Sequence, residues 1–167
     1  MTRVHSIAFW LISVAGLCMA ATSCSNDGCD GNSSSLPLAS LYVGNQQQTV
    51  SGLTIMGIGA PGDLLLVDSA TASEVYLPLR ANAASTSYAI SRWVTTEGGS
   101  RRLYDTLTID YEPIEFFHSL DCGTMFNFNV KSTAVTTHGI DSVIPLTPMI
   151  TNSTTPALRI YFTDFSQ

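Results

Sequence analysis

Beyond residue 37 the chain alternates between short apolar stretches and turn residues, which is the pattern of β-strands. The alternation is clearest in Met125–Lys131, where Phe126, Phe128 and Val130 share one parity and polar residues occupy most of the other. Strands of this kind bury one face and leave the other in water, as antiparallel sheets do. The pattern predicts strands at 39–43, 49–57, 64–67, 74–79, 87–95, 102–111, 115–120, 125–131, 142–146 and 157–163.

Turn residues separate these strands at intervals of about 8–12 residues, which is typical of a sandwich or barrel. The clearest turns are predicted at 60–63, 97–100 and 138–139. No long helical periodicity occurs in this part of the sequence. We therefore expect an all-β protein, an antiparallel immunoglobulin-like two-sheet β-sandwich, with a small closed barrel as the alternative.

The first part of the chain has a different pattern. Arg3 precedes an apolar run, Ile7–Ala21, which the polar Thr22 and Ser23 end. A membrane-spanning helix needs about 20 apolar residues, whereas a charged start and a shorter apolar run are typical of an export signal. We expect this signal to be cleaved from the mature protein.

Ala21-Thr22-Ser23-Cys24 resembles a bacterial lipobox, although that pattern usually has leucine where this chain has Ala21. Acylation of Cys24 would anchor the protein to a membrane by more than one acyl chain. The predicted parts are a signal peptide (1–23), an acylated tether (24–37) and one β-sandwich domain (38–167). The expected location is the outer membrane, on its periplasmic face or at the cell surface. Ordinary secretion with cleavage near Ala20 is the alternative.

The cysteines support an oxidising compartment. Cys18 leaves with the signal and Cys24 carries lipid, so Cys29 and Cys122 remain. A pair of cysteines in an exported domain usually forms a disulfide. Two free thiols or a metal pair are the alternatives, but no histidine or cysteine spacing nearby supports a metal.

The length and net charge of the chain further narrow the possible classes of protein. The chain is 167 residues long with a formal net charge of −6, and its few basic residues are scattered. This length fits one domain. A weakly acidic chain without a basic cluster is not expected to bind nucleic acid.

Several short motifs resemble an uncharacterised family of Bacteroidota lipoproteins known as a domain of unknown function. Besides the lipobox and Cys29, they are Asp105–Ile109, Asp121–Gly123, Thr137–Val143 and Leu158–Phe162. The resemblance implies an envelope lipoprotein with a β-sandwich body and supports the pairing of Cys29 with Cys122. It implies no catalytic residues.

Motifs for catalysis or cofactors are weak. Gly57–Gly62 matches the dinucleotide pattern G-x-G-x-x-G, but Pro61 interrupts it and a strand, not a helix, is predicted to follow. His118 and His138 could serve a serine hydrolase, yet no nucleophile-elbow motif is present. We therefore expect a glycine-rich turn, no cofactor and no enzyme.

Metal binding has little support. His118 and Asp121 lie near Cys122, but so few ligands do not make a zinc site. The carboxylates of Asp110, Glu112 and Glu115 flank a predicted bend at Pro113, whereas calcium requires six to eight oxygens. We expect a solvated acidic turn and no metal.

Aromatic residues on polar strand faces are the candidate ligand contacts. Trp93, Tyr104 and Tyr161 fall on the less hydrophobic parity of their strands. If they cluster, they could stack on sugar rings or contact a protein. Scattered singly, they would carry no functional meaning.

Modification sites are a separate hypothesis. Ser69, Thr106 and Ser142 each follow an aspartate and precede an apolar residue, which resembles the O-glycosylation acceptor of Bacteroidota proteins. Thr106 must point outward to be modified. Asn152 begins a eukaryotic N-glycosylation pattern, which we discount for a bacterial lipoprotein.

Together these patterns predict a non-enzymatic, membrane-anchored envelope lipoprotein that binds a protein or glycan partner. A structural or assembly component of the envelope is the second hypothesis, and a hydrolase is the third.

Overall fold

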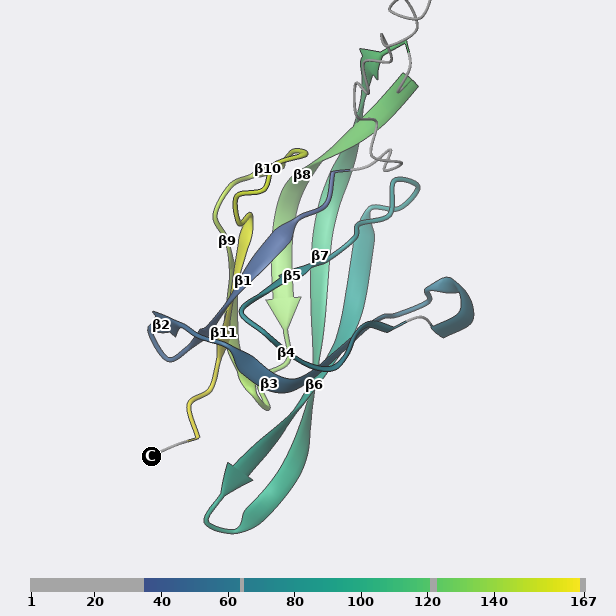
Figure 1. The fold of residues 1–167 in the computed structure, drawn as a ribbon. Helices are drawn as coiled ribbons and strands as arrows, with labels where there is room; N and C mark the ends of the chain where they lie inside the picture. The colour runs from purple at the N-terminus through teal and green to yellow at the C-terminus, as the bar shows by residue number, and fades with distance from the viewer. Residues whose placement is uncertain (1–34, 64, 121–122, 166–167) are drawn as a thin grey trace, which may run out of the picture. The chain divides into compact units, whose positions relative to one another are not determined.

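The longest element is β7 (Gly99–Ser119), a strand of 21 residues. β6 (Ser85–Thr96) runs antiparallel to its first part, and β8 (Gly123–Val135) runs antiparallel to its second part. β7 therefore belongs to two hairpins that project toward opposite ends of the domain (Figure 1). The computed structural model describes residues 35–63, 65–120 and 123–165.

The strands form two sheets. The order in the first sheet is β10-β8-β7-β6-β3-β4, which adds β10 (Met149–Ile150), β3 (Val50–Gly57) and β4 (Leu65–Ala72) to the hairpin strands. The order in the second sheet is β2-β1-β11-β9, with β5 also pairing β1. Its strands are β2 (Gln46–Gln47), β1 (Leu38–Val43), β11 (Leu158–Phe162), β9 (Ile140–Pro145) and β5 (Glu74–Tyr76).

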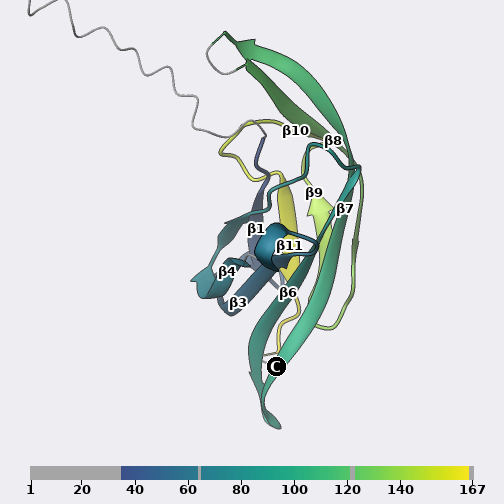
Figure 2. The same cartoon turned by 90° about the vertical axis from the view of Figure 1, so that its right-hand side faces the viewer.

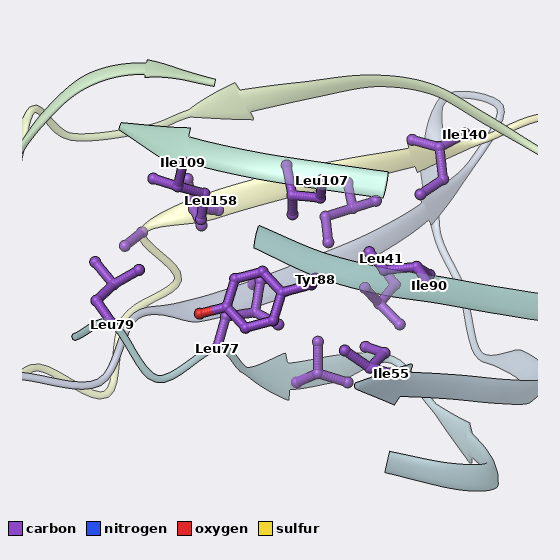
Figure 3. Packing of buried hydrophobic residues seen from close by; sticks show 14 of the residues in the cluster. Leu41, Ile55, Leu77, Leu79, Tyr88, Ile90, Leu107, Ile109, Ile140 and Leu158 are labelled. Atoms are coloured by element: carbon purple, nitrogen blue, oxygen red, sulfur yellow. The ribbon is translucent and has the colours of Figure 1, made fainter. Parts of the chain in front are cut away.

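The inner faces of the two sheets form one hydrophobic core (Figure 3). Leu41 and Leu158 of the second sheet are buried together with Ile55, Tyr88 and Leu107 of the first, and none of the five is more than 1% exposed. Figure 2 shows the long strands β6, β7 and β8 curving along one side of β1 and β11. Burying one such apolar side chain contributes about 1.5–3 kcal/mol. The predicted all-β sandwich is confirmed.

One pair of strands departs from the expected antiparallel arrangement. β1 runs parallel to β11, with Ala39 opposite Leu158 and Val43 opposite Phe162. Parallel neighbours cannot be joined by a tight turn, and here they are the first and last strands of the domain. The second sheet is therefore mixed, because its central pair, β1 and β11, is parallel while its other pairs are antiparallel.

The predicted bend at Pro113 is wrong, because the strands expected at 102–111 and 115–120 are one strand, β7. Pro113 lies opposite Phe128 of β8. On the other side, the pairing of β6 with β7 ends at Ser85 and Asp110. Pro113 thus lies where β7 is an edge strand, and an edge tolerates the missing N–H of proline.

The glycine-rich turn is confirmed. β3 ends at Gly57, a short 3-10 turn covers Pro61–Asp63, and the next element is the strand β4. Gly59 and Gly62 have φ of 74° and 70°, a region that glycine reaches without strain. A dinucleotide motif requires a helix after the glycines, so this segment is a connection between strands.

The first described strand, β1, begins at Leu38, next to the predicted domain boundary. The described residues all lie within one compact unit, residues 32–167. Among them no helix is long and apolar enough to cross a membrane.

Candidate binding surface

Trp93 and Tyr104 lie together on the outer face of the β6–β7 hairpin. Trp93 is opposite Arg102, and Ser91 is opposite Tyr104, so the two aromatic residues are diagonal neighbours on one face. Diagonal positions in an antiparallel pair lie about 7–8 Å apart, within reach of aromatic side chains. Trp93 is 55% exposed and Tyr104 is 64% exposed. The structure therefore brings two of the three candidate aromatics together in solvent.

Arg102 lies on the same face, directly opposite Trp93 and two residues before Tyr104. Its Nε donates a hydrogen bond to Ser91 Oγ at 3.1 Å, and its Nη2 donates one to Thr54 Oγ1 at 2.8 Å. The side chain thus crosses from β7 over β6 to β3, and its guanidinium lies 5.7 Å from the Tyr104 ring. These contacts hold the guanidinium in place while leaving some of its five N–H donors for a ligand. We call Trp93, Arg102 and Tyr104 the aromatic patch.

The backbone of β3 beside the patch lacks a side chain at Gly52, where φ is 63°. A Cβ added to Gly52 of β3 would lie 3.5 Å from Trp93 Cδ1, so the indole rests beside a residue without a side chain. Further along the same face, the hydroxyls of Ser87 and Thr108 pair across β6 and β7 at 2.9 Å. The patch therefore stands above a surface of small polar side chains.

A hollow of about 260 Å³ adjoins Trp93. It lies where β3 begins beside β6, and the C-terminal segment that follows β11 closes one side. Its lining includes Arg92, Thr95, Ser51 and Phe165. The hollow is open and has a mixed lining that also includes Val43, Val50 and Val94, and it extends the patch toward the inner face of the hairpin.

Arg92 anchors the segment beside this hollow. Its Nη2 donates to the backbone oxygen of Thr163, and its guanidinium lies 4.9 Å from the Phe162 ring and 5.6 Å from the Phe165 ring. Burial lowers the pKa of Arg92, although the carboxylates of Asp141, Asp105 and Asp164 act in the opposite direction. Arg92 is committed to the C-terminal segment, which leaves Arg102 as the cation of the patch.

Tyr161 is not part of the aromatic patch. It lies in β11 of the other sheet, where its ring is 5.1 Å from the ring of Tyr42. The guanidinium of Arg159 lies 5.3 Å from the Tyr42 ring. Because Ile160 and Phe162 face the core, Tyr161 faces outward from the second sheet. The three candidate aromatics therefore divide between the two sheets.

His138 contacts Asp105, but the pair has a structural explanation. Asp105 is 6% exposed, and its carboxylate accepts bonds from Thr136 Oγ1 at 2.9 Å and from the backbone N–H groups of His138 and Gly139 at 2.8 Å. His138 Nδ1 lies 3.2 Å from the same carboxylate. These bonds hold the turn between β8 and β9.

The remaining acidic residues are engaged separately. Glu112 forms an ion pair of 2.8 Å with Lys131, and Asp110 accepts a 2.7 Å bond from Ser132 Oγ. His118 packs against Phe116, with ring centroids 6.2 Å apart. Among the residues that the structure describes, no three histidine, cysteine, aspartate or glutamate side chains gather as metal ligands.

The candidate glycosylation residues differ in access. Ser69 is exposed on the edge strand β4, and Thr106 and Ser142 are partly exposed. Thr106 shares the outer face with Tyr104, as required, but the preceding Asp105 is buried. Cys24, Cys29 and Cys122 lie outside the described residues, so the lipidation and the disulfide stay predictions.

Arg102 is the contact that sequence reasoning missed. The turn predicted at 97–100 would place Tyr104 opposite Trp93, whereas the observed connection is only Glu97-Gly98, and this shorter turn places Arg102 opposite Trp93. Its hydrogen bond to Thr54 depends on β3 pairing with β6, which the local pattern does not specify.

Residues 52–162 match the model of a family described as a family of unknown function (DUF6452). The matched range includes the whole aromatic patch and both hairpins. No curated protein and no solved structure matches the chain.

Proposed function

The chain belongs to the family of unknown function DUF6452, and we propose that it is a non-enzymatic, lipid-anchored binding module of the cell envelope that recognises a glycan. The observation that carries the proposal is the aromatic patch: two exposed rings and one immobilised guanidinium on the outer face of a sheet. The acyl group on Cys24 and the outer-membrane location are parts of the same proposal.

Each component of the patch has a role in recognising a sugar. The face of a sugar ring carries C–H groups, which pack on indole and phenol rings as other apolar groups do. The free N–H donors of Arg102 would bind ring hydroxyls or a carboxylate. Because Arg102 is already held by Ser91 and Thr54, little conformational entropy is lost when the ligand binds.

The shape of the surface favours a polymer over a small molecule. Small ligands usually bind in enclosed pockets, whereas Trp93 and Tyr104 stand on the open outer face of a sheet. An open face of this kind can contact several successive units of a chain. We therefore expect an extended polysaccharide to bind along the β6–β7 hairpin.

Affinity electrophoresis in gels containing soluble polysaccharides tests this proposal. Wild-type protein should be retarded by at least one polymer, and Trp93→Ala or Tyr104→Ala should lose most of the retardation. Each ring is worth about 1 kcal/mol, or roughly fivefold in affinity. Tyr76→Ala is the matched control, because Tyr76 is 47% exposed but lies on β5 of the other sheet.

A wild-type protein that no envelope or dietary polysaccharide retards would contradict the glycan proposal. If wild type and both patch variants were equally retarded, the binding surface would lie outside the aromatic patch. The anchor is tested separately by the mass of the mature N-terminus, where an unmodified residue would contradict acylation of Cys24.

A structural role in envelope assembly is the second candidate. Among the described residues, the pairing of β6 with β3 ends at Ser91, whereas β6 pairs with β7 as far as Thr96, so the end of β6 has no ladder partner on its β3 side. An exposed edge can add a strand from a partner protein. Cross-linking from Thr95, which is exposed on this edge, would capture that partner in intact cells.

A further inference from the structure

The β7–β8 hairpin exposes apolar side chains at its end. The pairing of β6 with β7 stops at Asp110, so among the described residues the later part of β7 pairs with β8 alone across most of the hairpin. In this part Ile114 is 36% exposed, Phe117 is 64% exposed and Leu120, just after the strand, is 94% exposed. Exposed large apolar residues grouped at one projecting end indicate a contact with something outside the domain.

The apolar residues occupy both faces of this two-stranded ribbon. Successive residues of a strand point to opposite faces, so Phe116 and Phe117 point in opposite directions. Phe116 packs on His118, which shares its face. A flat protein surface would cover one face and leave the other in water, whereas a lipid surface that the ribbon enters covers both.

The chain reaches the domain beside this same hairpin. The backbone N–H of Ser35 donates to the oxygen of Phe126 at 2.9 Å, and Ser35 Oγ donates to Asn127 Oδ1 at 2.9 Å. Ser35 is fully buried. Gly123, where β8 begins, lies three residues from Phe126, or about 10 Å along the strand. Ser35, the first described residue, therefore lies near the apolar end of this hairpin.

The number of residues between Cys24 and Ser35 limits how far the domain can lie from the membrane that holds the acyl group. From Cys24 to Ser35 the chain spans at most about 40 Å when fully extended. We propose that Ile114, Phe117 and Leu120 enter a lipid surface next to the acyl anchor, so that the domain rests on the membrane by its β7–β8 hairpin. This inference rests on the proposed anchoring at Cys24.

The charges near the hairpin specify the kind of lipid. Glu112 and Glu115 are exposed on the same ribbon, and Lys131 is already paired with Glu112. Nearby carboxylates are repelled by anionic headgroups. The surface that fits is therefore zwitterionic, such as phosphatidylcholine or phosphatidylethanolamine.

This contact would also orient the aromatic patch. The patch lies at the first end of β7 and the apolar residues lie toward its last end, and the strand measures about 65 Å along its path. In Figure 1 the two hairpins project from opposite ends of the domain. A domain standing on its β7–β8 hairpin therefore presents Trp93 and Tyr104 away from the membrane.

Depth-dependent fluorescence quenching tests the contact. The full chain is produced in its own host with Trp10→Phe and Trp93→Phe, which removes both native tryptophans. Phe117→Trp or, as the control at the opposite end, Tyr104→Trp then places one reporter. Each protein is reconstituted into phosphatidylcholine vesicles with brominated acyl chains, and flotation is measured on the same samples. Interfacial residues lie about 5–10 Å into the boundary of headgroups and acyl chains, so the tryptophan at 117 should lose most of its emission and that at 104 should lose none.

The outcomes separate the two proposals. Flotation without quenching at 117, or with equal quenching at 117 and 104, overturns the hairpin contact and leaves the anchor intact. Failure to float overturns the anchor and the hairpin contact together. A photoreactive phenylalanine analogue at 117 supplies a second measurement in intact cells: cross-links to lipid support the contact, and a cross-linked protein in place of lipid overturns it.

Discussion

The carboxylate of Asp105 in β7 accepts a 2.8 Å hydrogen bond from the backbone N–H of Gly139, which lies 34 residues later in the chain. The same carboxylate accepts a second backbone bond from His138 and a third bond from the Thr136 hydroxyl. The turn between β8 and β9 lies outside both strands, and this one buried side chain bonds it to β7. A His–Asp pair that suggests catalysis is here a means of closing a long connection.

Asp105→Asn should destabilise the domain. Both carboxylate oxygens accept bonds from N–H donors, so an amide nitrogen at either position would face a donor. The expected loss in the free energy of unfolding is about 1–3 kcal/mol, measured by urea denaturation. Asp110→Asn is the control, because Asp110 accepts an exposed bond from Ser132. Equal stability of the two variants would contradict the structural role of Asp105.

Gly139→Ala should destabilise the same turn from the other side. An added Cβ would lie 2.9 Å from Leu103 Cδ1 and 3.2 Å from Leu103 Cβ, closer than packed atoms allow. Overpacking of this kind costs about 1–3 kcal/mol. Gly98→Ala is the matched control, because the nearest atom there is 3.8 Å away. In a Leu103→Ala background, Gly139→Ala should lower the free energy of unfolding by less than it does in the wild type, because the clashing side chain has been removed. A double-mutant cycle measures this difference.

Because of Tyr88, the free energy of unfolding should fall at alkaline pH. Burial, with a smaller effect of Tyr111, raises the pKa of Tyr88 far above its ordinary value of 10.0, and its hydroxyl donates to the oxygen of Pro78. Below pH 10 the phenol is neutral in both states, so this contribution is fully present. Above pH 10 the unfolded chain loses the proton and the folded chain keeps it, so the free energy of unfolding falls by about 1.4 kcal/mol per pH unit.

Urea denaturation above and below pH 10 measures this slope. Tyr88→Phe should flatten it, although the variant starts from a lower stability because the bond to Pro78 is lost. Tyr76→Phe is the control, since Tyr76 is solvated in the folded protein as well. A slope that Tyr88→Phe leaves unchanged would assign the alkaline transition to another group.

Ser69 should be the preferred residue if the protein is O-glycosylated. It is exposed with a φ of 46°, and Asp68 beside it is exposed too, whereas the aspartate before Thr106 is buried under four contacts. A transferase that reads the aspartate can reach the first site more easily. In protein purified from its own host, Ser69→Ala should remove glycan mass and Thr106→Val should not. The opposite result would show that access to the aspartate does not matter.

Local pattern was enough to predict the fold class and most strands. The alternation in β6 and β11 reports which face is buried, because side chains of a strand have a period of two. In β8 it does not, since Met125 is buried although it lies on the more polar parity. The turn predicted at 97–100 likewise indicated the hairpin, and the strand parities predicted that Trp93 and Tyr104 lie on its more polar face. These features depend on neighbours in sequence, and so the sequence carries them.

Pairing between distant segments required the tertiary structure. Nothing near Ala39 or Leu158 in sequence specifies that β1 and β11 run side by side in parallel, since that register depends on burying both strands in one core. The bond from Arg102 to Thr54, and the separation of Tyr161 from Trp93, follow from the same long-range assembly. The amino-acid sequence by itself determined which residues face solvent, and the assembly of the two sheets decided which of those residues meet, because strand order is set by the shared core and not by local alternation.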